Sequence, residues 1–132
     1  MNVIVWTNSS GSVSICTPTG ELPIEEVKSK DTPADSVIVD TGTFPADVDF
    51  IDAWVLQGSV VSVDMGRAKE FTKKRLRAAR EPLLQKLDVD FQRALESGID
   101  PAPIVAEKQR LRDITKLPDA CTSLDELRAL HC

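Results

Sequence analysis

The chain has 132 residues, a hydrophobic fraction of 42%, a charged fraction of 28% and a formal net charge of −5, which are the proportions of one globular domain. No stretch approaches the roughly 18 consecutive apolar residues of a membrane-spanning helix. The cysteines are odd in number and far apart, which argues against a disulfide framework and fits synthesis in a reducing cytosol. They are Cys16, Cys121 and Cys132.

The N-terminal part of the chain is predicted to form a β-hairpin and a short helix. Residues 3–7 are a β-rich run, and residues 12–16 alternate polar and apolar side chains with a period of two. A cluster of turn-forming residues separates the two runs, so the pattern predicts a hairpin. A short helix is predicted over residues 21–28, with Pro23 in its first turn.

Three further strands are predicted before residue 64. Residues 37–39 form a short apolar run that ends in a turn region. Residues 50–56 are predicted to be a strand that presents Phe50 and Trp54 on one face. Gly58 then allows a tight turn into a strand over residues 60–63, so these last two strands are predicted to form a second hairpin.

At Asp64 the apolar period changes from two to about 3.6, and Asp64 itself is a suitable helix N-cap. Pro82 interrupts the helical pattern, and a proline inside a helix costs about 3 kcal/mol unless it is compensated. Two interpretations remain open at this point: one kinked helix, or a second helix that begins with Pro82 in its first turn. The apolar stripe before this point is Met65, Ala68, Thr72, Leu76, Ala79, and after it Leu83 and Leu87.

The pattern ends at Gly98, a suitable helix C-cap, and a short connector with Asp100 as a cap leads to another helix. A short terminal helix follows, capped by Thr122 or Ser123. We therefore expect an α+β fold: a small antiparallel β-sheet, an α-helical hairpin over 65–115 and a short C-terminal helix. The β-rich region 1–63 and the helical region 64–132 are expected to form one compact unit. The later stripe residues are Leu84, Phe91, Ala94, Leu95, Ile104, Val105, Leu111 and Ile114.

Charge is distributed unevenly along the chain. Residues 1–63 hold nine acidic and two basic residues, whereas residues 64–132 hold fourteen basic and twelve acidic ones. Within 67–80, seven basic residues accompany the single acid Glu70. Such a segment could be a solvated helix face, a surface for protein contact or a track for nucleic-acid phosphates, and the acidic balance of the whole chain disfavours the last. The candidate partner-binding residues are Trp54, Arg67, Lys73, Lys74, Arg77 and Arg80. For Trp54 there are two interpretations, an exposed interface anchor or, more commonly for such a residue, a place in the core.

One short motif has catalytic associations. Val37-Ile38-Val39 followed by Asp40-Thr41-Gly42 resembles the active-site turn of aspartic proteases, which need two carboxylates that share a proton. Thr43 stands where that family usually has Ala or Ser, and the helical pattern after residue 64 leaves too little chain for the β fold of that family. The lone histidine and the lack of metal-ligand spacing argue against other sites, so we expect no catalytic residue, no cofactor and no metal.

Two stretches resemble a known group of proteins. The first is Phe-Ile-Asp-Ala-Trp-Val at 50–55, followed by a Gly turn and Val-Asp-Met at 63–65. The second is Arg-Leu-Arg-Ala-Ala-Arg at 75–80, with Arg-Ala-Leu-Glu at 93–96 and Lys-Gln-Arg-Leu-Arg-Asp-Ile at 108–114. Over roughly residues 50–116 the chain resembles small proteins of tailed bacteriophages, namely tail-assembly chaperones and tail-fibre or baseplate accessory proteins.

The resemblance implies a non-enzymatic role in tail-tip, baseplate or tail-fibre structure or assembly. The implied partners are other phage tail, baseplate or tail-fibre proteins, with no nucleic acid and no membrane, and a homo-oligomer is left open. The implied location is the virion tail, or the host cytoplasm during assembly. Pro82 and the extension after Pro118 depart from the family pattern, and the first 49 residues are not covered. The alternatives are a dimeric aspartic protease that uses Asp40 and a small nucleic-acid-binding regulator that uses the basic helix 67–80.

Overall fold

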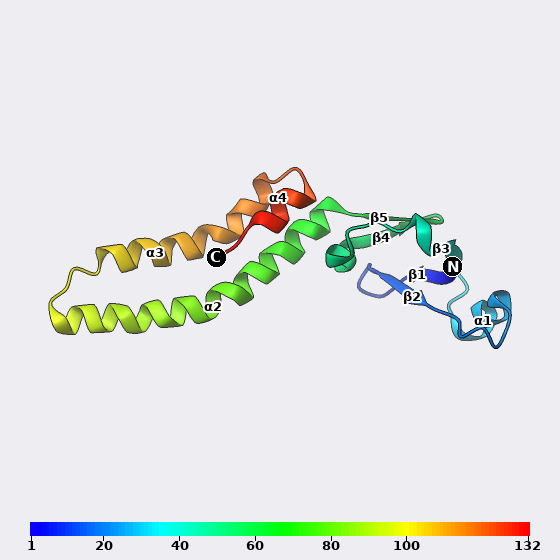
Figure 1. Cartoon of the computed structure of the whole chain (residues 1–132), viewed down its shortest axis with the longest axis horizontal. Coiled ribbons are helices and arrows are strands. Elements are labelled where there is room, and N and C mark those ends of the chain that lie inside the picture. Colours follow the sequence, from blue (N-terminus) through cyan, green and yellow to red (C-terminus); the bar gives the residue numbers. More distant parts are fainter. The chain divides into compact units, whose positions relative to one another are not determined.

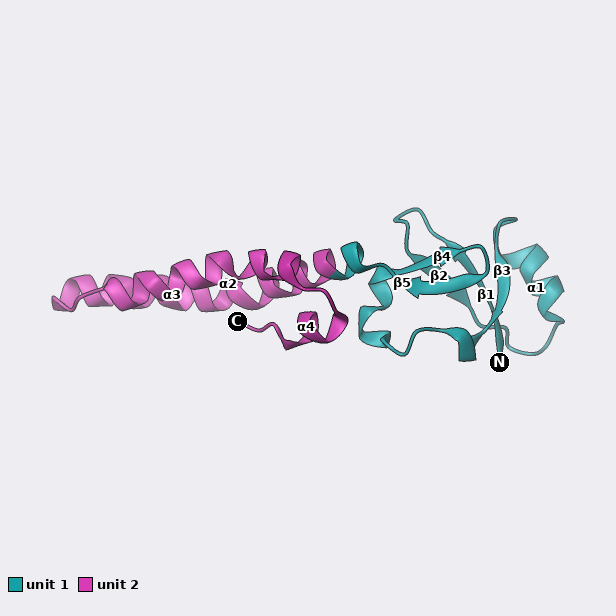
Figure 2. Cartoon of the chain, turned by 90° about the horizontal axis from the view of Figure 1, so that it is seen from above, with its two compact units in different colours: residues 1–68 teal, residues 69–132 magenta.

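The chain folds into two compact units. A computed structural model describes all 132 residues, and contacts divide them into Met1–Ala68 and Lys69–Cys132 (Figure 2). We expected one compact unit in which a β-rich region changes to a helical region at residue 64. The observed boundary lies inside a long helix instead, because the first turn of that helix packs with the sheet region.

Unit 1 contains a three-stranded antiparallel sheet with the order β2-β1-β3 and a separate β4–β5 hairpin. Strand β1 is the central strand and pairs Val3 with Val39 and Val5 with both Ile15 and Val37. The predicted antiparallel α+β class is therefore confirmed. The strands are β1 (Asn2–Thr7), β2 (Val13–Cys16), β3 (Val37–Asp40), β4 (Trp54–Gln57) and β5 (Val60–Val63).

The core of unit 1 lies where the β4–β5 hairpin meets one face of the three-stranded sheet. Strand alternation brings Val3, Val5 and Val39 to that face, and the hairpin contributes Trp54 and Val61. The Phe44 ring packs against Trp54 with their centroids 5.4 Å apart. Burial of these aliphatic and aromatic groups holds the two β elements together.

Helix α1 (Ile24–Asp31) begins three residues later than the predicted helix over 21–28. Pro23 is its N-cap rather than part of its first turn, and the Pro23 carbonyl accepts hydrogen bonds from the amides of Glu26 and Val27. Proline fits there because its missing N–H would have no helical partner.

The predicted strand over 50–56 is wrong in its first half. Residues Val48–Ala53, η2, form two short 3-10 turns that meet at a kink at Phe50 (φ −105°, ψ 26°), and the strand begins only at Trp54. Phe50 and Ala53 are both buried, and a spacing of three residues does not match the period of two of a strand. A further short 3-10 turn, η1 (Thr41–Thr43), follows β3.

Helix α2 (Met65–Ser97) runs through Pro82 as one helix, which decides between the two interpretations of that proline (Figure 1). The Asp64 carboxylate accepts a hydrogen bond from the amide of Arg67 at 2.9 Å, so its predicted N-cap role is confirmed. Pro82 lies on an exposed part of the helix, where water can satisfy the carbonyl group of Ala78 that proline leaves without a donor.

Gly98 ends α2 as predicted, with φ +69°. Its amide bonds to the Leu95 carbonyl, and the amide of Ile99 bonds to the Ala94 carbonyl at 2.9 Å, which is the pattern of a Schellman motif. The Asp100 carboxylate then accepts from the amide of Ala102 at 3.0 Å. These contacts reverse the chain within four residues and start the next helix.

Helix α3 (Ala102–Asp113) returns alongside α2, so the predicted helical hairpin is present (Figure 1). The 3-10 turn η3 (Ile114–Ala120) and helix α4 (Leu124–Ala129) complete unit 2. Ser123 caps α4 by accepting from the amide of Glu126, whose carboxylate accepts from Thr122. Of the two predicted caps, Thr122 and Ser123, the structure therefore has Ser123.

The apolar stripe of unit 2 is buried at one end of the hairpin and open at the other. The core residues Leu76, Leu111, Ile114 and Leu127 are at most 2% exposed. Ala94 is the one buried residue of α2 beyond Leu76. Several predicted stripe residues are exposed instead, because no further element covers them: Ala79, Leu83, Leu95 and Val105.

Candidate protein-contact surface

Two arginines of the basic segment complete the ends of neighbouring helices. The Arg75 guanidinium donates to the carbonyls of Leu127 and Leu130, at 3.1 and 2.9 Å, at the C-terminus of α4. The Arg80 guanidinium donates to the carbonyls of Leu111 and Arg112 at the C-terminus of α3. The last carbonyls of a helix lack internal partners and carry partial negative charge. These arginines therefore hold unit 2 together.

Two lysines of the same segment bind Asp119 in η3. Lys73 Nζ lies 2.8 Å from an Asp119 carboxylate oxygen, and Lys69 Nζ donates to the Asp119 carbonyl. The hydrogen bond from Lys73 lowers the pKa of Asp119, and the same contact raises the pKa of Lys73. Lys73, a predicted partner-binding residue, is accordingly committed to contacts within the chain.

Arg67 belongs to unit 1 and is bound there. Its guanidinium donates to the Ser10 carbonyl at 2.9 Å and to the Ser12 hydroxyl at 3.2 Å, both in the β1–β2 turn. Gly11 in this turn has φ +82°, a left-handed conformation that favours glycine, and a Cβ atom there would also displace the Arg67 guanidinium. Arg67 thus ties the turn to the start of α2.

Of the six predicted partner-binding residues, only Lys74 and Arg77 are exposed and make no hydrogen bond or ion pair within the chain. Trp54 is 2% exposed, and its indole nitrogen donates to the Asp47 carbonyl at 3.3 Å. Trp54 is therefore a core residue of unit 1, and the hypothesis of an exposed anchor is wrong for this side chain. It is buried because η2 and the sheet enclose it.

The surface that sequence reasoning missed is the distal part of the hairpin, residues 83–105, where large apolar side chains face solvent. Leu95 is 53% exposed, Val105 48% and Ile99 63%. Leu83 and Val89 are also exposed. The spacing of these residues could have indicated the surface, since the apolar stripe is broader than one neighbouring helix can cover.

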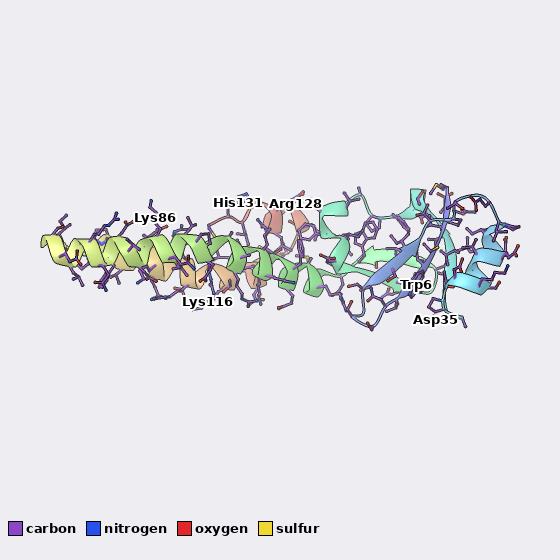
Figure 3. The ribbon with its side chains drawn as sticks, turned by 90° about the horizontal axis from the view of Figure 1, so that it is seen from below. Trp6, Asp35, Lys86, Lys116, Arg128 and His131 are labelled. Atoms are coloured by element: carbon purple, nitrogen blue, oxygen red, sulfur yellow. The ribbon has the colours of Figure 1, made fainter.

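A groove of about 270 Å³ opens on one side of this hairpin. Leu83, Leu87 and Leu111 form its apolar floor, and its rim is charged. Across the rim, the Arg110 guanidinium binds the Glu107 carboxylate at 2.6 Å. Lys86 belongs to the same rim and extends outward from α2 (Figure 3).

Asp40, the residue with catalytic associations, caps the turn that follows β3. Its carboxylate accepts a hydrogen bond from the amide of Gly42 at 2.7 Å, and its carbonyl accepts from the Thr43 hydroxyl. The Gly42 amide and, after it, the ammonium group of Met1 lower the pKa of Asp40. Asp40 thus has a capping role at an exposed turn, and no second carboxylate approaches it within the chain.

No group of three or more His, Cys, Asp or Glu side chains is placed to hold a metal ion, and all three cysteines are free. No helix has a stretch that is both long and apolar enough to cross a membrane. No family model, curated protein or solved structure matches this chain. The class of this protein is therefore defined by its fold: it is an α+β protein of two units, with exposed apolar side chains on its helical hairpin.

Proposed function

We propose that this chain is a non-enzymatic protein of a tailed bacteriophage that acts in tail-tip, baseplate or tail-fibre structure or assembly. It works by contact with other tail proteins, in the virion tail or in the host cytoplasm during assembly. The observation that carries the proposal is the distal hairpin, where Leu95, Ile99 and Val105 are each about half exposed or more. Clustered exposed apolar residues on a folded protein typically mark a protein contact site.

The resemblance to tail accessory proteins supports the same proposal, because its residues fall on the parts that build the hairpin. Arg75 and Arg80 bind the ends of α4 and α3, and Leu111 and Ile114 are buried between the helices. The resembling residues therefore build the helical hairpin whose distal part exposes apolar side chains, and such a surface suits a protein that binds others during assembly.

The alternative functions have less support. Five of the seven bases in 67–80 bind groups of the chain itself, which leaves Lys74 and Arg77 for phosphates. Two basic residues attract the phosphates of a nucleic acid only weakly. For a protease, Asp40 would need a partner carboxylate that only a second chain could bring.

The test is a mass spectrum of purified virions together with a pull-down of the full chain against the tail proteins of the same phage. We expect the chain in the particle or in a complex with a tail protein. A matched pair of variants locates the contact: Leu95→Glu changes the open hairpin, and Ile51→Glu changes a similarly exposed apolar residue of unit 1. The chain's absence from both particles and tail-protein complexes would refute the proposal.

A further inference from the structure

Strand β2 lies at one side of the three-stranded sheet, and its outer edge has no partner within the chain. The strand order is β2-β1-β3, so only one edge of β2 is paired. The hydrogen bond from the Asn8 amide to the Ser12 carbonyl continues the register of β1 with β2. Because bonded and non-bonded pairs alternate in an antiparallel ladder, Val13 and Ile15 direct their backbone N–H and C=O groups outward. No other group of the chain bonds to these outward groups.

This outer edge is open to another strand. Val13 and Ile15 are partly exposed, and β2 contains no Lys, no Pro and no bulge, the features that usually block the edge of a sheet. The other edges of unit 1 offer less. On β3 the Thr43 hydroxyl already bonds to the Asp40 carbonyl, and Val61 of β5 is only 5% exposed. The edge of β2 is therefore the best template in unit 1 for an added strand.

The open edge leads into a hollow of about 270 Å³ between the end of β2 and helix α1. Cys16 and Thr17 line it from the strand, and Val27 and Asp31 line it from the helix, which the loop after β2 reaches directly (Figure 1). Cys16 pairs with Ile4, which alternates with the core residues of β1, so both side chains point away from the core of unit 1. The hollow therefore lies on that second face of the sheet, beside the open edge.

Pairing with this edge would bring one side chain of the added strand to the hollow. An extended segment alternates its side chains between the two faces of a sheet. In an antiparallel pair, the residue opposite Cys16 points to the same face as Cys16, which is the face of the hollow. Since Val13 and Ile15 make the backbone bonds, this residue belongs to a non-hydrogen-bonded pair, in which the two side chains are closest.

The hollow is acidic. Glu21 and Asp31 belong to its lining, and neither carboxylate forms an ion pair within the chain. The lysines of α1 do not neutralise them, because Lys30 binds Glu26 at 2.6 Å and Lys28 lies outside the lining. A basic side chain is therefore the complementary occupant.

We propose that the outer edge of β2 binds an extended, basic segment of another protein as an added antiparallel strand, with a Lys or Arg side chain in the hollow. Backbone hydrogen bonds to Val13 and Ile15 hold the segment, and Glu21 and Asp31 select its basic side chain. The same edge of a second copy fits poorly, since it brings the same two carboxylates. This surface belongs to unit 1, so the inference is independent of the proposed function, which the distal hairpin of unit 2 supports.

The experiment is a nuclear magnetic resonance titration of the isotope-labelled full chain with a capped peptide, Thr-Val-Thr-Lys-Thr-Val-Thr. We expect saturable shifts of the amide signals of Val13 and Ile15. A peptide with Glu in place of Lys should bind at least about threefold more weakly, because the ion pairs are lost. N-methylation of the residues on either side of the Lys should abolish binding, whereas N-methylation of the Lys itself should not, since its own amide points away from β2.

Variants of the chain test the hollow itself. Glu21→Gln combined with Asp31→Asn should weaken the Lys peptide by about threefold to tenfold, the range expected when two exposed ion pairs are lost. The matched control is Glu25→Gln, which removes an exposed carboxylate of α1 outside the lining and should leave binding unchanged. Circular dichroism should show the same fold in all variants.

Three results would overturn the inference. They are the absence of saturable shifts at this edge up to about 1 mM peptide, equal binding of the Lys and Glu peptides, and equal effects of the two N-methylated forms. The presence of the chain in virions or tail complexes is measured separately, so failure of either proposal can be told from failure of the other.

Discussion

At the scale of single residues, the arginines of α2 differ in role although the sequence presents them as one basic run. Arg75 binds two carbonyls at the end of α4, whereas Arg77 is exposed and bonds to nothing within the chain. A hydrogen bond from a charged donor contributes about 1.5–3 kcal/mol. The position of each arginine on the helix, rather than its charge, therefore decides whether it stabilises the fold.

Arg75→Met should lower the free energy of unfolding by about 1–3 kcal/mol, because two carbonyls at the end of α4 lose a charged donor. Urea denaturation followed by circular dichroism measures this change. Arg77→Met is the matched control and should stay within about 0.5 kcal/mol of the wild type. Equal effects of the two substitutions would contradict the capping role of Arg75.

The Lys73–Asp119 pair predicts a pH dependence of stability. The pKa of Asp119 is lowered in the folded chain by the hydrogen bond from Lys73, so the pair stabilises the fold above the unfolded pKa of about 3.9. This contribution is lost as pH falls through the folded pKa. Asp119→Asn should therefore be less stable than the wild type at neutral pH, with the difference disappearing in acid.

Urea denaturation at a series of pH values measures this difference. Asp35→Asn is the control, because Asp35 projects into solvent from the loop before β3 and has no bonded partner (Figure 3). It should follow the wild type at every pH. A difference between Asp119→Asn and the wild type that persists in strong acid would point to a cause other than the ion pair.

At the scale of elements, helix α2 contains one residue that does not suit its backbone conformation and ends at another residue that does. Pro82 stands inside a continuous, exposed stretch of helix, where the backbone loses a hydrogen bond. Gly98 at φ +69° instead occupies a left-handed position that favours glycine. One residue therefore weakens the element and the other completes it.

Pro82→Ala should raise the free energy of unfolding by about 1–3 kcal/mol, because alanine restores the amide and is the best helix former. The thermal midpoint measures this gain. Gly98→Ala should act in the opposite direction and cost about 1 kcal/mol, since alanine disfavours a positive φ. A Pro82→Ala variant less stable than the wild type would mean that the proline is required by contacts within unit 2.

At the scale of the whole molecule, each unit has its own core. Val3, Val5 and Trp54 belong to the core of unit 1, and Leu76 and Leu111 belong to that of unit 2. Both tryptophans lie in unit 1, whereas most of the helical residues lie in unit 2. Fluorescence and circular dichroism therefore report on different parts of the chain.

We expect the urea transitions seen by tryptophan fluorescence and by far-ultraviolet circular dichroism to have different midpoints, because separate cores can unfold separately. In the Trp54→Ala variant, Trp6 remains as the fluorescent tryptophan of unit 1. The substitution should lower the urea midpoint detected by fluorescence more than the urea midpoint detected by circular dichroism. Superimposable transitions in the wild type and the variant would show that the two units unfold as one.

The sequence by itself determined the elements that depend on local chemistry. The Asp64 cap, the Gly98 termination, the β1–β2 hairpin and the helical hairpin could be predicted because each rests on neighbouring residues. The uses of Arg75, Arg80 and Lys73 could not be predicted, because their bonding depends on residues that lie far away in sequence. Likewise, only the tertiary structure decided that Pro82 stays within one helix and that the distal hairpin keeps an apolar face open. Helical spacing defines a face, but only packing decides whether another element of the chain covers it.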